Sequence, residues 1–325
     1  MSGISSLGGR VGVTILEILI FSAGLLLLIK GSDIFVEAAT RIAEAFKVSE
    51  FLIALVLASV ATTLPEVTVS AISSYRGNSG IAIGNAVGSA LANIALILAI
   101  SAMIMPLNVD KIASENSLIM VGVTFYAWLL MSNGEISRIE GLTLVLIYAA
   151  FLYYLYRKHV KLEEVEKKSR CNVTRDVLIL FLSGGMVILG AELVVDSAVK
   201  IARAIGIPEV VIGVTLVSIG TSLPEFANSL TATLKKIPNV SVGNIIGADI
   251  LDILMVIGIA SMIRPIRVDP SIVKIVMPIT LLVMIILTVS LFRNNKIGRK
   301  TAVTLLIIYS AFIYLLTQGK VYIPG

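Results

Sequence analysis

Ten long apolar stretches follow one another along the chain, separated only by short polar breaks. Their approximate bounds are 12–46, 48–76, 79–105, 112–132, 137–157, 174–205, 207–235, 238–263, 270–292 and 297–317. About 20 apolar residues cross a bilayer as a helix, whereas the strands of a membrane barrel alternate apolar and polar residues. These stretches are continuously apolar, and only 14% of all residues are charged, against about 25% in soluble domains. The sequence therefore predicts an all-α integral membrane protein with ten transmembrane helices.

The second half of the chain repeats the first half 159 residues later. The matched positions run from Gly31 to Asp110 without a gap, and they include the tripeptide LPE at 64–66 and again at 223–225. Each half holds five expected spans, and an odd number makes the second half enter the membrane from the opposite side. We therefore expect two inverted five-helix repeats, an arrangement typical of secondary transporters.

Charge predicts the division of the chain and its orientation. A short charged linker (158–173) separates a first repeat (1–157) from a second repeat (174–325). Lys and Arg are more frequent in the linker and in the loops expected on its side of the membrane than on the opposite side. Because positively charged loops stay in the cytoplasm, we expect a multi-pass protein of the cell membrane with both termini outside.

Each half places a proline and a glutamate together inside an apolar stretch, Pro65 with Glu66 and Pro224 with Glu225. Proline lacks an amide hydrogen, so it leaves the carbonyl four residues earlier without its helical bond. A carboxylate at membrane depth is costly and usually functional. Residues three and four apart share a helix face, so the spacing predicts that the hydroxyl residues just before each glutamate stand over it. These residues are Thr62 and Thr63 in the first half, and Thr221 and Ser222 in the second.

The next stretch of each half adds further oxygen atoms. Ser89 and Asn93 are four residues apart in "GNAVGSALAN", and Asp252 matches Asn93 in "GNIIGADILD". The chain has one cysteine and one histidine, Cys171 and His159, and both lie in or beside the linker. Carboxylate, hydroxyl, amide and carbonyl oxygens suit hard cations such as calcium, whereas zinc and copper sites use sulfur or imidazole. The paired motifs thus predict a site for hard cations between the halves.

These motifs resemble the two alpha repeats of the sodium/calcium exchangers, a family of the calcium/cation antiporter superfamily. "ATTLPE" with "GNAVGSALAN" and "GTSLPE" with "GNIIGADILD" carry the resemblance, which extends through the ten-helix layout. The short linker resembles that of the prokaryotic members. The resemblance implies a shared set of metal-binding residues, in which Glu66 and Glu225 are the central calcium ligands, Thr62 and Thr221 add oxygens, Asn93 and Asp252 flank the centre, Thr63, Ser222 and Ser89 offer hydroxyls to sodium, and Ser59 and Ser218 offer backbone carbonyls.

The sequence departs from the family pattern at two adjacent positions. Ala248 stands where relatives commonly have a serine that binds sodium, and Asp249 stands where asparagine is common. These departures leave open whether sodium or protons drive transport. Asp252 is an acid, as in potassium-dependent relatives, so potassium dependence also stays open.

The resemblance also implies that the first and sixth helices slide to alternate access. We expect them to be interrupted at 31–33 and at 190–192. Asp33 and Glu192 are then candidates for the ion path, and local pairing of Asp33 with Lys30 is the alternative.

We interpret the chain as a secondary active antiporter that exchanges calcium for sodium. The alternatives are a proton-driven exchanger of calcium or another divalent cation, a potassium-dependent exchanger and, with less support, a cation channel. A primary pump is disfavoured because the sequence has no GxxxxGK[ST] phosphate loop. We expect no enzymatic activity, no cofactor and no nucleic-acid partner; the expected partners are calcium ions, sodium ions and the lipid bilayer. The oligomeric state cannot be read from the sequence.

Overall fold

The computed structural model describes residues 2–45, 58–159 and 173–318, and its long elements are all helices. The first half contains α1 (Ser2–Ala45), α3 (Ala58–Tyr75), α4 (Ser79–Ala92), η2 (Asn93–Leu98), α5 (Ala99–Ile104), α6 (Lys111–Met131) and α7 (Arg138–His159). The second half contains α8 (Val173–Ile205), α9 (Glu209–Ile212), η3 (Gly213–Val217), α10 (Ser218–Thr221), α11 (Leu223–Leu234), α12 (Pro238–Leu251), η4 (Asp252–Val256), α13 (Ile257–Ile263), η5 (Ile272–Val276), α14 (Met277–Asn294) and α15 (Arg299–Thr317). Within the described ranges these elements form ten helical units at the positions that the apolar stretches predicted. The all-α membrane fold is thus confirmed.

Membrane-spanning length and apolarity are met by seven helices of the described residues, or eight with the bent segment of α9 to α11. That segment bends by 46° between Thr221 and Leu223, beside Pro224. The matching proline of the first half, Pro65, lies inside the continuous helix α3. The two prolines therefore have different local effects, although they occupy equivalent positions of the repeat.

Short antiparallel strand pairs tie the two halves together reciprocally. β1 (Leu107–Asn108) pairs with β4 (Lys296–Ile297), and β2 (Glu135–Ile136) pairs with β3 (Ile266–Arg267). A strand of each half thus pairs with the other half at two places. This reciprocity is what two copies of one unit produce when they face opposite ways.

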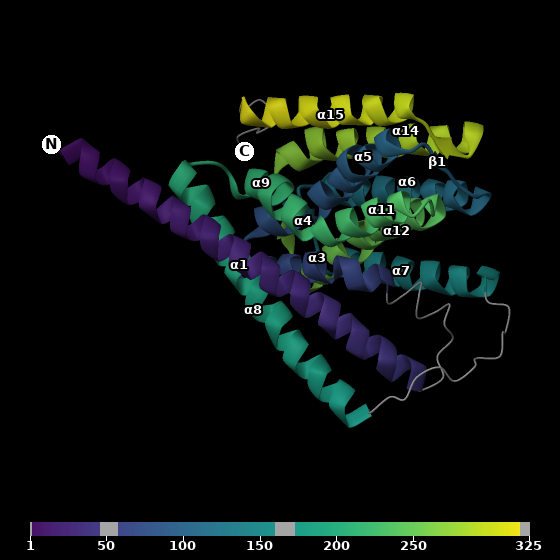
Figure 1. The fold of residues 1–325 in the computed structure, drawn as a ribbon. Coiled ribbons are helices and arrows are strands. Elements are labelled where there is room, and N and C mark those ends of the chain that lie inside the picture. Colours follow the sequence, from purple (N-terminus) through teal and green to yellow (C-terminus); the bar gives the residue numbers. More distant parts are fainter. Residues whose placement is uncertain (1, 46–57, 160–172, 319–325) are drawn as a thin grey trace.

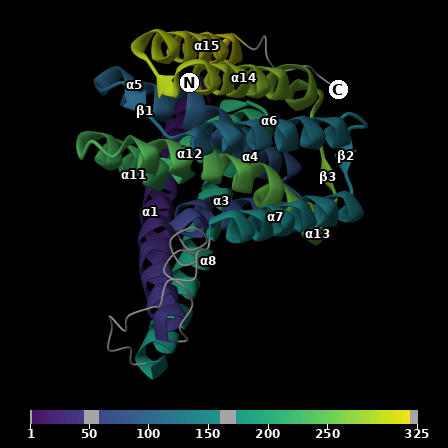
Figure 2. The same ribbon diagram turned by 90° about the vertical axis from the view of Figure 1, so that its right-hand side faces the viewer.

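Helices α1 and α8 lie side by side and cross the other helices obliquely (Figure 1). In the view turned by 90° they run nearly at right angles to α6, α7, α14 and α15 (Figure 2). The two helices touch through backbone at glycines, since a Cβ on Gly190 would lie 2.6 Å from the backbone nitrogen of Leu28. A Cβ on Gly24 would likewise lie 2.7 Å from the Cβ of Leu193.

The expected interruptions of the first and sixth helices are wrong. Helix α1 runs unbroken through 31–33, and α8 runs unbroken through 190–192. The glycines serve close packing instead, because a Cβ on Gly31 would lie 3.0 Å from the Cβ of Met186. Asp33 pairs locally with Lys30, with 3.6 Å between Oδ2 and Nζ, as the alternative expectation held.

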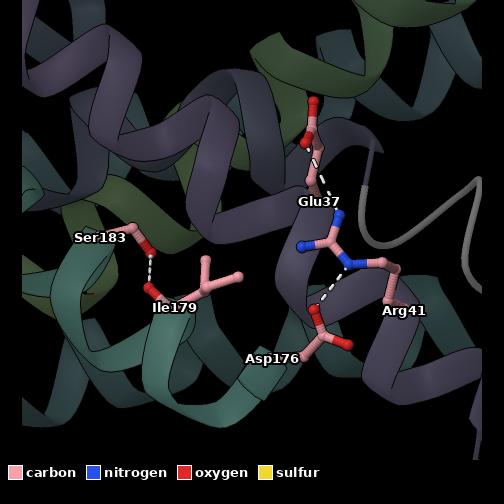
Figure 3. Close-up of polar contacts among 5 residues, drawn as sticks. All are labelled: Glu37, Arg41, Asp176, Ile179 and Ser183. Atoms are coloured by element: carbon pink, nitrogen blue, oxygen red, sulfur yellow. Dashed lines mark hydrogen bonds and ion pairs between the residues drawn. The ribbon is translucent and has the colours of Figure 1, made fainter. Parts of the chain in front are cut away.

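Ion pairs join α1 to α8 near both ends of their contact. Glu17 Oε1 lies 3.2 Å from Lys200 Nζ at one end. At the other end Arg41 Nε donates to Asp176 Oδ1 over 2.7 Å, beside a longer contact from Arg41 to Glu37 (Figure 3). The α1–α8 pair, the name used below for these two helices, is thus linked twice by charge and once by close backbone packing.

Candidate cation site

Two buried glutamates from different repeats lie at the centre of the molecule, and each is held by a hydroxyl from the opposite repeat. Thr63 Oγ1 donates to Glu225 Oε1 over 3.4 Å, and Ser222 Oγ donates to Glu66 Oε1 over 3.3 Å. Both carboxylates are only 1% exposed. The two bonds are equivalent under the repeat, because Thr63 matches Ser222 and Glu66 matches Glu225.

This geometry corrects the expectation that Thr63 and Ser222 stand over the glutamate of their own helix. Each hydroxyl does lie on the same helix face as the glutamate three residues later. The helices of the two repeats lie close enough, however, for each hydroxyl to contact the glutamate of the other repeat. Thr62 and Thr221 also contact the glutamate of the other repeat. Thr62 interacts with Glu225, and Thr221 interacts with the carboxylate of Glu66. Sequence spacing within one helix could not show this exchange of partners.

Asn85 is a polar residue of the site that the sequence reasoning missed. Its Nδ2 donates to Ser70 Oγ over 3.0 Å and to the backbone oxygen of Glu66 over 3.3 Å. Its Oδ1 accepts from Thr221 Oγ1 over 3.0 Å. Asn85 therefore links the backbone of one glutamate to a hydroxyl of the other repeat. The signal was present, because the same Gly-Asn pair recurs at Asn244.

Asn93 and Asp252 occupy matched positions at two breaks of helix geometry. Asn93 is the first residue of the π-helical segment η2, and Asp252 is the first residue of η4. Such segments widen the helix locally and are frequent at functional sites. Asp252 is 1% exposed, and it interacts electrostatically with Glu66, Asp249 and Glu225. Asp252 therefore belongs to the same group of charges as the central glutamates.

Asp249 also lies in this group, and the structure shows it turned toward the first repeat. Its side chain is fully buried, and Oδ1 accepts from Asn93 Nδ2 over 3.0 Å. The sequence had marked this residue only as a departure from the family pattern.

The remaining expected ligands lie around this centre. Ser89 Oγ donates to the backbone oxygen of Ser218 over 3.4 Å, so that carbonyl faces the first repeat. Ser218 O also accepts from Thr221 Oγ1. Ser59 falls in the first turn of α3, and its side-chain environment lies outside the described residues. Ala248 is buried and offers no hydroxyl opposite Ser89.

Several buried oxygens of the site have no hydrogen-bond partner among the residues that the structure describes. They are Glu66 Oε2, Glu225 Oε2, Asn93 Oδ1, Asp249 Oδ2 and both carboxylate oxygens of Asp252. Burying an unpaired polar group costs about 1–3 kcal/mol, and an unpaired charge costs far more. Buried carboxylates are therefore protonated, paired or bound to metal ions, so cations or protons are the natural partners of this set.

The carboxylates do not converge into a ready-made metal cage. In the part of the chain that the structure describes, no three acidic, histidine or cysteine side chains are close enough to hold a metal ion. A cation bound here takes hydroxyl, amide and carbonyl oxygens together with its carboxylates. Such a mixed shell suits an ion that has to leave again.

The family model described as sodium/calcium exchanger protein matches this chain twice, over residues 16–157 and 176–318. The chain belongs to the sodium/calcium exchanger family. The two matches together cover both halves of the exchanger and leave out the linker between them.

Relatives and solved structures agree over nearly the whole length of this exchanger. An uncharacterized membrane protein of Methanocaldococcus jannaschii is 36% identical, with 92% of this chain and 97% of the relative covered. The sodium/calcium exchanger MaX1 of Methanosarcina acetivorans is 29% identical at the same coverage. A solved structure of the sodium-calcium exchanger NCX_Mj, soaked with sodium and without calcium, is 35% identical with a TM-score of 0.67. It covers 93% of this chain and 99% of its own.

Proposed function

We propose that this chain is a secondary active antiporter that exchanges calcium for sodium across the cell membrane by alternating access. The observation that carries the proposal is the crossed contact at the centre, in which each repeat supplies a hydroxyl to the glutamate of the other. A site built this way needs both repeats at once, as expected where two inverted repeats meet at a substrate site. The similarity to the sodium/calcium exchangers MaX1 and NCX_Mj supports sodium and calcium as the ions.

In this proposal the role of each site residue follows from the kind of oxygen atom that it offers. Glu66 and Glu225 are the central calcium ligands, and Thr62 and Thr221 complete the shell beside them. Asn93 and Asp252 flank the centre. The hydroxyls of Thr63, Ser222 and Ser89, with the carbonyls of Ser59 and Ser218, hold sodium when calcium is absent.

In this proposal the transport of calcium is coupled to that of sodium because the two ions compete for the same carboxylates. Two ionised glutamates in a buried site repel each other unless positive charge lies between them. One calcium ion or a pair of sodium ions supplies that charge, so the two cations exclude each other from the same oxygens. A neutralised site can pass through an occluded state at low cost, whereas a charged site stays open to water on one side.

The moving part in this proposal is the α1–α8 pair. Its two ion pairs and its glycine contact favour movement of both helices as one unit. Arg76, which follows α3, contacts Glu192 and Asp196 of α8. This contact links the moving pair to the helices that hold the glutamates.

The proposal includes the orientation and division of the chain. Residues 1–157 and 174–325 are the two repeats, 158–173 is a cytoplasmic linker, and both termini face outward. The exchanger acts as a transporter without enzymatic activity or a cofactor, and its partners are the two ions and the bilayer.

Calcium uptake into liposomes that contain the purified protein tests the proposal. The liposomes are loaded with sodium and diluted into sodium-free buffer with radioactive calcium, and a parallel batch has a pH gradient and no sodium. We expect uptake only with the sodium gradient, and no further stimulation by potassium. Uptake driven only by the pH gradient would replace sodium with protons, and non-saturable flux without a counter-ion would indicate a channel.

A further inference from the structure

The two repeats differ in the helix position of one polar side chain, and this difference decides which side chain faces Asn93. The first repeat has Ser89 followed by Ala90, and the matched pair in the second repeat is Ala248 followed by Asp249. The polar group has moved by one residue, about 100° around the helix. As a result Asp249 meets Asn93 of the opposite repeat, while Ser89 meets the backbone of Ser218.

The contact between Asp249 and Asn93 fixes the orientation of an amide. Asn93 presents its NH₂ group to Asp249, and Nδ2 donates to Oδ1 over 3.0 Å. An ionised carboxylate only accepts hydrogen bonds, so Asp249 holds this orientation whenever it is ionised. The opposite orientation would place two oxygens against each other in a buried site. The amide oxygen of Asn93 therefore faces away from Asp249.

That amide oxygen is buried and lacks a hydrogen-bond partner in the described part of the chain. Asn93 is 1% exposed, and its Oδ1 has no hydrogen-bond partner among the described residues. Buried polar atoms are almost always satisfied, and a cation is attracted to an amide oxygen and repelled by an amide NH₂. A fixed amide is useful at such a place because a free one could turn its NH₂ toward the ions.

We propose that Asp249 is a positioning residue, which holds the amide of Asn93 so that its oxygen serves as a cation ligand. The inference rests on the proposed function, since it assigns a role beside the same cation site. It explains why the second repeat has a carboxylate at 249 although the first repeat has an alanine at the matched position. It also predicts that Asp249 acts through Asn93 and not through general stability.

The experiment measures calcium affinity by calorimetry on the purified full-length protein, so that binding is separated from transport. We expect D249N to weaken calcium binding about tenfold, which corresponds to roughly 1.4 kcal/mol. The reason is that an amide at 249 can donate its NH₂ to Asn93 Oδ1, which has no other hydrogen-bond partner among the described residues. This pairing is then the favoured one, and it occupies the oxygen that should bind the cation. Ser261→Ala is the matched control, because Ser261 is buried on the following helix and donates to the backbone oxygen of Gly258 in its own turn.

Two further variants test the route of the effect. In a protein that already carries N93A, the substitution D249N should not lower the calcium affinity further, because residue 93 then has no amide to hold. The exchange of partners, N93D with D249N, should recover most of the affinity, because the donor and the acceptor then change places. Recovery distinguishes positioning from a fold that merely needs Asp249.

The outcomes separate this inference from the proposed function. Wild-type affinity in D249N, or an equal loss with and without Asn93, would overturn the role of Asp249. Wild-type protein that binds calcium but shows no counter-ion-driven flux would overturn the proposed exchange, and the binding test of Asp249 would still hold. Wild-type protein that binds no calcium would overturn both.

Discussion

Thr63 donates a hydrogen bond to Glu225, a residue 162 positions away in the other repeat. Its equivalent, Ser222, donates to Glu66 in the same way. The two contacts make the carboxylate environment of each repeat depend on the position of the other. In the proposed exchange, both repeats therefore contribute to binding each ion.

Removal of either central carboxylate should abolish exchange. In E66Q or E225Q one charge is lost from a buried set that depends on cations for neutrality, so sodium-driven calcium uptake should fall to the level of protein-free liposomes. The control is E135Q, which changes an exposed carboxyl group in β2 and should retain uptake. Full uptake by either E66Q or E225Q would sink the assignment of the site.

Loss of either crossed hydroxyl should weaken calcium binding to a similar extent. Hydrogen bonds to charged groups contribute about 1.5–3 kcal/mol, so T63A and S222A should each raise the half-saturating calcium concentration roughly tenfold or more. Ser73→Ala is the control on α3, because the buried Ser73 hydroxyl has no partner within the described ranges of the chain. A large effect of T63A together with none of S222A would contradict the equivalence of the two contacts.

Close contact of α1 with α8 should depend on Gly190. The Cβ of G190A would lie 2.6 Å from the backbone nitrogen of Leu28, and backbone cannot turn aside. Overpacking of this kind typically costs about 1–3 kcal/mol, so the melting temperature and the uptake rate should both fall. A Cβ on Gly185, in the same helix, meets nothing within 4 Å. G185A should therefore be neutral or slightly stabilising, and equal behaviour of the two variants would refute the packing argument.

The ion pair of Arg41 with Asp176 should stabilise the α1–α8 pair, whereas the contact of Arg41 with Glu37 should contribute little. Asp176 is 5% exposed, and its carboxylate accepts a short bond from Arg41, which raises the pKa of the arginine above its usual value (Figure 3). The side chain of Glu37 is 72% exposed and 3.7 Å away, and such surface pairs have little effect. We expect R41M to lower the melting temperature measurably and E37Q to leave it unchanged; the reverse order would show that the buried partner is not the important one.

The contact of Arg76 with α8 should affect the rate of exchange more than the affinity. Arg76 contacts Asp196 and Glu192, whose side chains are 54% and 47% exposed, away from the buried glutamates. The substitution R76Q removes the ion pairs that join the end of α3 to α8 in this conformation. The maximal uptake rate should therefore change, whereas the half-saturating calcium concentration should stay within about twofold of the wild-type value. A changed affinity at a constant rate would place Arg76 in the binding site and not in the movement.

The paired motifs predict most of the candidate site from sequence because the repeat supplies its own comparison. Glu66 and Glu225 stand at equivalent positions, and Asn93 with Asp252 recur in the same way. Asn85 was equally visible as a repeated asparagine, but its role depends on contacts to Ser70 and Thr221. Those contacts join separate helices, and no local pattern predicts them.

The sequence by itself determined the membrane class, the positions of the helices, the repeat and the chemical nature of the site. Hydrophobic length and residue type are local properties, and a bilayer leaves few ways to satisfy the backbone. Only the tertiary structure decided that each hydroxyl serves the glutamate of the other repeat, that Asp249 faces Asn93, and that the glycines of α1 and α8 pack helices without breaking them. These are properties of how helices cross, and crossing is set by packing between segments about 160 residues apart.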